Sequence, residues 1–124
     1  MNKDWIIYLC GIYSFGFAVF HLFFWRLFRW KTGLNTISKP NKGILQIANV
    51  QLICLLLFVS YVCFVFTTDL YQTGLGKAFL GGFAFFWFIR TVQQFIFLRI
   101  NHWMVHLLTI IFAIGTGLFL LPLL

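Results

Sequence analysis

The chain has 124 residues, of which 62% are hydrophobic, 22% are aromatic and only 9% are charged. An average soluble domain carries about 25% charged residues, so this composition excludes an ordinary soluble fold, and the length allows one small domain. The formal net charge of +7 would suggest nucleic-acid binding in a soluble protein. Here the cations lie between long apolar runs, so membrane orientation explains them and no nucleic-acid partner is expected.

Four apolar stretches are long enough to cross a bilayer. A helix rises 1.5 Å per residue, so a hydrocarbon core about 30 Å thick needs about 20 apolar residues. The stretches are residues 5–25, 44–66, 78–98 and 103–121. Each must be helical, because lipid satisfies no backbone polar group. Pro40 is expected in a loop, Thr67-Thr68 in a turn, and Pro122 at the end of the last helix. Short loops then predict an all-α, antiparallel four-helix bundle that spans the membrane.

The basic residues predict the orientation of this bundle. The first loop carries Arg26, Arg29, Lys31, Lys39 and Lys42, and Arg99 borders the third loop. The positive-inside rule therefore places these two loops in the cytoplasm and both termini on the non-cytoplasmic side. The first loop also contains aromatic and aliphatic residues, so it is expected to lie on anionic membrane lipid. The expected location is a bacterial cytoplasmic membrane.

Polar residues within the spans gather on one face of each helix, where a bundle interior is expected. These faces are Gly11, Ser14, Ala18, His21 and Trp25; Gln46, Asn49, Ile53 and Ser60; Gly82, Phe86, Arg90, Gln93 and Phe97; and His102, His106, Thr109, Ala113 and Thr116. His21, Asn49 and Gln94 each lie about 7–8 Å from the cytoplasmic end of their span. We therefore expect a polar, cationic pocket in the cytoplasmic half. Its ligand-binding residues would be Arg90, Gln93, Gln94, Asn49, Gln46, His21 and Trp25.

Arg90 is the most informative residue of this layer. A central arginine costs about 2.5–3.5 kcal/mol to insert, and none of the four predicted spans contains a carboxylate that could pair with it. The partners of Arg90 must be amides, carbonyls, water, an anionic ligand or another subunit. Structural alternatives are hydrogen bonds to Gln93, Gln94 and Asn49, or extension of the side chain to the inner interface.

The three histidines raise a second possibility, a metal or haem site. His102 and His106 are four residues apart, and His21 could add a third ligand for zinc, copper or iron. Alternatively, His21 and one histidine of the fourth helix would hold a b-type haem. In the structural alternative, His102 caps the fourth helix and His106 donates to a carbonyl. The identity of any cofactor therefore stays open.

The residues His21, Phe24 and Trp25 leave the first span, and a basic loop and Asn49-x-Gln51 follow. This arrangement resembles uncharacterised families of small four-span bacterial membrane proteins. The resemblance implies the four-span architecture and no particular activity.

The favoured function is binding or transport of an anionic or amphiphilic small molecule or lipid. Transport would favour a homodimer, because one four-helix monomer has little room for a wide pore. A haem- or metal-binding membrane redox protein is one alternative. A structural subunit of a larger membrane complex is another, with Arg90 meeting an acidic group on a partner helix. No GxSxG, HExxH or P-loop motif is present, so a non-enzymatic role is favoured and no catalytic residue is predicted.

Overall fold

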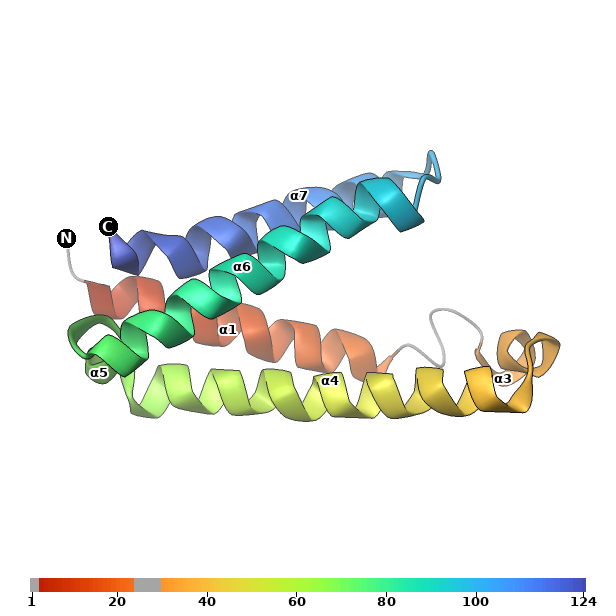
Figure 1. The fold of residues 1–124 in the computed structure, drawn as a ribbon, viewed down its shortest axis with the longest axis horizontal. Helices are drawn as coiled ribbons and strands as arrows, with labels where there is room; N and C mark the ends of the chain where they lie inside the picture. Colours follow the sequence, from red (N-terminus) through yellow and green to blue (C-terminus); the bar gives the residue numbers. More distant parts are fainter. Residues whose placement is uncertain (1–2, 24–29) are drawn as a thin grey trace. The chain divides into compact units, whose positions relative to one another are not determined.

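The computed structural model describes residues 3–23 and 30–124, and every regular element in these ranges is helical (Figure 1). The α-helices are α1 (Lys3–Leu22), α3 (Trp30–Gly33), α4 (Lys39–Val65), α5 (Thr67–Gln72), α6 (Gly74–Phe97) and α7 (Trp103–Leu120). Two 3₁₀ helices occupy Leu34–Thr36 and Leu121–Leu123. The all-α fold class predicted from the sequence is therefore confirmed.

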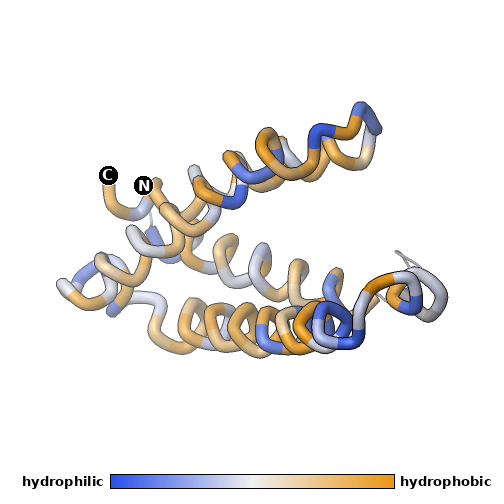
Figure 2. Tube along the Cα trace, turned by 45° about the vertical axis from the view of Figure 1, so that its right-hand side comes forward, coloured by the Kyte–Doolittle hydropathy of each residue, from blue (hydrophilic) through white to orange (hydrophobic). Residues whose placement is uncertain are grey.

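Four of the helical segments are long and apolar enough to cross a membrane. They are Lys3–Leu22, Lys39–Val65, Gly74–Phe97 and Trp103–Leu123, with 20, 27, 24 and 21 residues. Hydrophobic residues dominate their paths, and hydrophilic residues gather at the turn between α6 and α7 (Figure 2). Large apolar side chains such as Phe85 and Phe95 are exposed, as a lipid-facing surface requires. These features fit a multi-pass membrane protein.

The helix boundaries differ from the predicted ones where local capping chemistry is present. Pro40 lies in the first turn of α4 and not in a loop, because a first-turn residue needs no backbone N–H donor. Thr67-Thr68 begins the short helix α5, where the sequence predicted a turn. α6 begins at Gly74, because the Thr73 Oγ1 accepts a hydrogen bond of 3.0 Å from the Gly76 N–H. Pro122 lies two residues after the end of α7, in the second 3₁₀ helix, as its predicted place at the end of the last helix implies.

The chain divides into two compact units. The first contains residues 3–10 and Cys63–Leu124, and the second contains the described residues of Gly11–Val62. The predicted four-helix bundle and the side of the membrane on which the termini lie stay predictions.

In the first unit, α6 and α7 form an antiparallel pair held by aromatic contacts. The Phe83 and Phe119 ring centroids lie 5.9 Å apart, and the Trp87 and Phe112 rings stack at 5.7 Å with an angle of 18° between their planes. Such pairs contribute about 0.5–1.5 kcal/mol beyond the area that they bury. Trp87, Phe112 and Phe119 are buried, so large rings and not polar groups form most of this interface.

In the second unit, side chains of α4 bind backbone carbonyls of α1. The Ser60 Oγ donates to the Gly11 carbonyl at 2.9 Å, and the Asn49 Nδ2 donates to the His21 carbonyl at 3.1 Å. Residue numbers fall along α4 as they rise along α1, so the two segments are antiparallel. Small and polar residues thus join these helices, as is usual where lipid removes the hydrophobic driving force between helices.

The corner between α5 and α6 is tightly packed around Gly76. A Cβ added to Gly76 would overlap the Asp69 carbonyl oxygen and the Leu70 Cα, which are backbone atoms and cannot rotate away. A Cβ added to Gly74, two residues earlier, would meet no atom within 4 Å. The close approach of α5 to α6 therefore requires glycine at position 76.

We predict that Gly76→Ala destabilises the protein by about 2 kcal/mol, the usual cost of overpacking a closely packed site. Gly74→Ala is the matched control and should leave stability unchanged or raise it slightly, because alanine favours helix. Thermal unfolding of both variants in one neutral detergent measures the difference. Equal unfolding midpoints for the two variants would contradict the close packing of α5 against Gly76.

Candidate functional site

Arg90 lies in α6 and is half-buried. Its Nη1 donates a hydrogen bond of 2.9 Å to the Oε1 of Gln94, one helical turn later. Its guanidinium carbon lies 4.5 Å from the centroid of the Phe112 ring, in a cation–π contact. Such a contact contributes about 2 kcal/mol when it is desolvated. An amide and an aromatic face therefore hold the cation in place.

Gln94 connects this cation to α7. Only 2% of its surface is exposed. While its Oε1 accepts from Arg90, its Nε2 donates to the Val105 carbonyl and to the Thr109 Oγ1, both at 3.2 Å. Thr109 in turn donates to the Val105 carbonyl at 2.9 Å. The amide of Gln94 is thus fully occupied by the fold, which makes Gln94 a positioning residue for Arg90.

No described residue forms an ion pair with Arg90. The chain has two acidic side chains, Asp4 and Asp69, and both lie at the other end of the first unit. Asp69 precedes α6, whereas Arg90 lies sixteen residues into it, about 24 Å along the axis. Asp4 hydrogen-bonds the Tyr71 side chain of α5. The guanidinium charge is therefore not neutralised by either of them.

Gln93 differs from its neighbour. It is half-buried and makes no hydrogen bond to any residue in the described ranges. α6 meets α7 through the buried residues Leu80, Ala84, Trp87 and Gln94, whereas Gly82 and Phe97 of the predicted face are exposed. That this face lines the interior of a four-helix bundle stays a prediction. The face with Gln93 and Arg90 borders the contact with α7 and keeps donors available for another molecule.

The second unit holds the other predicted site residues. The His21 Nδ1 lies 2.7 Å from the Phe17 carbonyl oxygen and donates to it, so a neutral ring keeps Nε2 as an acceptor. Asn49 is 8% exposed, and its Oδ1 is buried without a hydrogen bond to a described residue. Gln46 is half-buried on the same helix. Trp25 falls outside the described residues. That His21 and Asn49 join Arg90 in one pocket stays a prediction.

The fourth-helix histidines have separate structural partners. His102 is the N-cap of α7, and its Nδ1 accepts a hydrogen bond of 3.1 Å from the Met104 N–H. The His106 Nε2 lies 3.0 Å from the Asn101 Oδ1. The predicted fourth-helix face is offset in the same way as that of α6, with His106 and Ala113 exposed and Phe112, Gly115 and Phe119 buried. Within the described part of the chain, no three metal-ligating side chains gather, and the metal or haem hypothesis stays a prediction.

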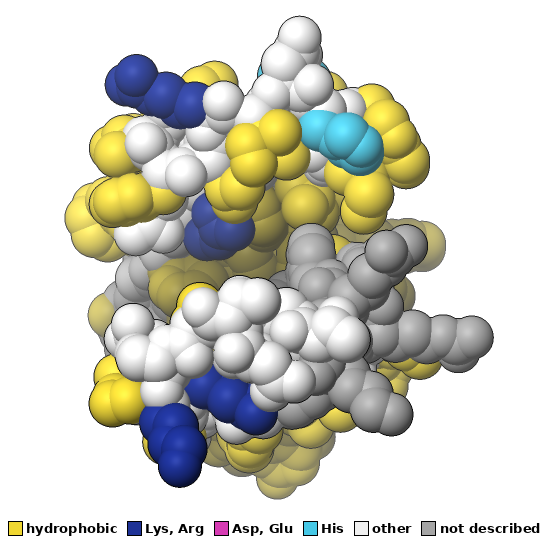
Figure 3. All heavy atoms as spheres, turned by 90° about the vertical axis from the view of Figure 1, so that its right-hand side faces the viewer, with side chains coloured by type: hydrophobic (Ala, Val, Ile, Leu, Met, Phe, Trp, Pro, Cys, Tyr) yellow, Lys and Arg dark blue, Asp and Glu magenta, His cyan; other side chains and the backbone are white. Residues whose placement is uncertain are grey.

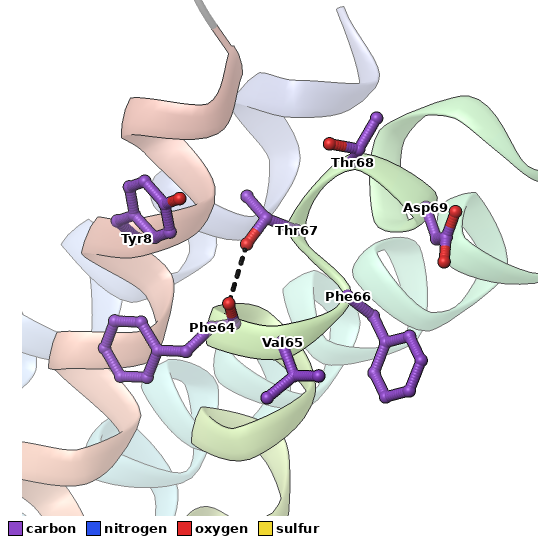
Figure 4. Close-up of a pocket in the computed structure, with 7 residues that line it drawn as sticks. All are labelled: Tyr8, Phe64, Val65, Phe66, Thr67, Thr68 and Asp69. Atoms are coloured by element: carbon purple, nitrogen blue, oxygen red, sulfur yellow. Dashed lines mark hydrogen bonds between the residues drawn. The ribbon is translucent and has the colours of Figure 1, made fainter.

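Two surface depressions in the first unit were not foreseen. One, of about 260 Å³, lies at the α6–α7 turn, where Arg99, Asn101 and His106 meet apolar side chains. The other, of about 220 Å³, is lined by Tyr8 and residues 64–69 (Figure 4). Figure 4 shows the Tyr8 hydroxyl directed toward Thr67, whose Oγ1 donates to the Phe64 carbonyl at 3.2 Å. The sequence signal for the depression at the α6–α7 turn is a cation, Arg99, beside polar residues in an otherwise apolar segment.

No protein-family model, curated protein or solved structure matches the chain. The function is therefore inferred from the residues themselves.

We predict that Gln94→Leu lowers stability by about 1–2 kcal/mol, because it removes hydrogen bonds between membrane helices and leaves the Arg90 guanidinium without its amide acceptor. Gln93→Leu makes the same chemical change at a residue without hydrogen bonds to described partners, and should stay within about 0.5 kcal/mol. Unfolding in mixed micelles of neutral detergent and dodecyl sulfate measures both. A larger loss for Gln93→Leu would refute the assignment of Gln94 as the connecting residue.

The contact between Asp4 and Tyr71 predicts that the stability of the protein depends on pH. The hydrogen bond to Asp4 is the largest cause that raises the pKa of Tyr71 above its ordinary value of 10.0. A raised pKa in the folded state gives stability that is complete below the unfolded pKa and is lost as pH rises through the folded one. Wild type should therefore melt above Tyr71→Phe at neutral pH, and this gap should shrink above pH 10. If the difference in melting temperature between wild type and Tyr71→Phe persists at strongly alkaline pH, the contact between Tyr71 and Asp4 is not its cause.

Proposed function

We propose that this protein binds an anionic or amphiphilic small molecule or lipid inside the membrane, through Arg90. The observation that carries the proposal is a half-buried guanidinium, in a helix long enough to span a bilayer, with no ion-pair partner among the described residues. A charge in this environment is costly and usually functional. An anion brought by a ligand would neutralise it.

The chemistry of the guanidinium sets the ligand class. Arginine carries five N–H donors in a plane that matches carboxylate and phosphate oxygens. One donor binds Gln94 and the guanidinium lies over the Phe112 ring, so the orientation of the group is fixed while further donors remain. Gln93 adds an amide three residues along the same helix face. The neighbouring Phe86 and Phe112 are apolar, which suits a ligand with a hydrocarbon part.

The remaining predicted residues belong to the same proposal. His21, Asn49, Gln46 and Trp25 would line the pocket from the other helices, in the same half of the membrane as Arg90. The positive-inside rule would make this the cytoplasmic half of a bacterial cytoplasmic membrane, with both termini outside. Transport of the ligand would involve a second copy of the chain. A role as an assembly subunit explains the same unpaired cation, with a carboxylate on a partner helix in place of the ligand.

The test is binding of dodecyl phosphate to the full-length protein in neutral detergent, followed by calorimetry. Arg90→Ala should weaken binding about tenfold or more, because a charge-assisted hydrogen bond contributes about 1.5–3 kcal/mol. Arg90→Lys should give an intermediate loss, because lysine keeps the charge without the planar donor set. Lys77→Ala removes a cation from the other end of the same helix and should leave affinity unchanged.

Equal affinity of wild type and Arg90→Ala, with equal melting temperatures, would refute ligand binding at Arg90. Co-purification of a stoichiometric membrane protein that is lost in Arg90→Ala, without any binding of dodecyl phosphate, would favour the assembly role instead.

A further inference from the structure

The depression at the α6–α7 turn combines two kinds of surface. Its exposed rim carries Arg99, Asn101 and His106, and no carboxylate lines it. Its wall is apolar and includes Phe95, Leu98 and Val105. In the upper part of Figure 3, where the α6–α7 end of the first unit faces the viewer, basic and histidine side chains lie among hydrophobic ones, and no acidic side chain of the described residues is visible. A ligand that fits this depression has an anionic group joined to a hydrocarbon part.

Hydrogen bonds to the fold prepare the rim for an anion. The Arg99 Nε donates to the Phe95 carbonyl at 3.0 Å, which holds the guanidinium beside α6 and leaves its terminal nitrogens without a hydrogen bond to any described residue. The His106 Nε2 lies 3.0 Å from the Asn101 Oδ1, so the Asn101 oxygen is occupied and its NH₂ group remains a donor. The rim therefore offers N–H donors and a positive charge to an oxyanion.

The position of the turn in a membrane identifies the source of this anion. The 24 residues of α6 extend about 36 Å, which exceeds the hydrocarbon core of about 30 Å. Arg99 follows the end of α6 by two residues and would therefore lie at the level of the lipid headgroups when α6 spans a bilayer. Phospholipid phosphates occupy that level. A free phosphate ion in the same place would make no use of the apolar wall.

The volume of the depression suits a headgroup better than a complete lipid. Ligand pockets for drug-sized molecules measure about 300–1,000 Å³, and this depression measures about 260 Å³. Exposed Ile96 follows Phe95 of the apolar wall on α6 and offers a surface for acyl chains outside the depression. The depression thus suits a phosphate with its glycerol, and the chains would lie against the helix.

We propose that the α6–α7 turn is a binding site for the phosphate group of an anionic membrane phospholipid, with Arg99 and Asn101 as its donors. This site does not depend on the proposed function of Arg90, which is not among its lining residues. The two sites share Gln94 alone, and the amide of Gln94 is already occupied. Their ligands can therefore be separated by mutation.

The experiment is native mass spectrometry of the full-length protein in neutral detergent, titrated with dioleoyl phosphatidylglycerol. Arg99→Gln should weaken the tightest lipid-binding event about tenfold, whereas Lys77→Gln, the same charge loss at the start of α6, should change it less than twofold. Asn101→Asp keeps the oxygen that faces His106 and adds a like charge for the phosphate, and should weaken binding at least as much. Gln72→Glu is its matched charge control at an exposed site.

The outcomes separate the possible ligands. Binding that survives excess inorganic phosphate and Arg90→Ala, but is lost in Arg99→Gln and in Asn101→Asp, supports the site. Displacement by inorganic phosphate would show a free-phosphate site and overturn the proposal. Binding within twofold of wild type in a folded Arg99→Gln or Asn101→Asp variant would also overturn it, and so would equal losses in the variants and their controls.

Discussion

The packing of the first unit depends on one positive charge, Arg90, that lies within an apolar helix. Arg90 costs free energy wherever lipid surrounds α6, and no acidic side chain in the described ranges offsets that cost by pairing with it. The fold responds with a buried amide and an aromatic ring, both fixed by α7. Gln94 reaches the backbone and a hydroxyl of α7, and Phe112 supplies the ring. The same contacts between α6 and α7 therefore hold the two helices together and fix the position of the Arg90 guanidinium.

The charges of the first unit are divided between its two ends. Both carboxylates lie near α5, where Asp4 binds Tyr71, while Arg90 and Arg99 lie toward the α6–α7 turn. Lys77 is an exception, because it lies near the start of α6. This separation keeps acidic side chains away from both proposed anion sites. It also means that an anionic ligand at the turn meets no repulsion from a neighbouring carboxylate of this unit.

The sequence predicted the helices well, because apolar runs of about 20 residues have few other solutions in a membrane. The boundaries were less predictable where single residues decide them. Thr73 caps α6 earlier than its apolar run begins, and Pro40 fits the first turn of α4. Hydropathy contains no information about either effect.

The sequence predicted one contact of the candidate site within the second unit, but not the direction of the α6 side chains. The sequence placed His21 and Asn49 at one level, and the structure brings the Asn49 amide to the His21 carbonyl. It did not distinguish Gln93 from Gln94, because adjacent residues differ by about 100° around a helix and the predicted faces favoured polar residues over rings. Trp87 and Phe112 pack between α6 and α7, and that packing turns Gln94 inward. Aromatic residues occur both in this helix interface and on the lipid-facing surface, so the sequence alone does not show which rings are buried.

The stacking of Trp87 on Phe112 has an optical consequence. The ring that supports the Arg90 guanidinium also lies 5.7 Å from the indole of Trp87, so the cation and this fluorophore share one neighbour. Indole emission depends on nearby charge and polarity. Neutralisation or displacement of the guanidinium would alter the emission spectrum of Trp87. The indole would thus report, within the protein itself, whether a ligand occupies the site at Arg90.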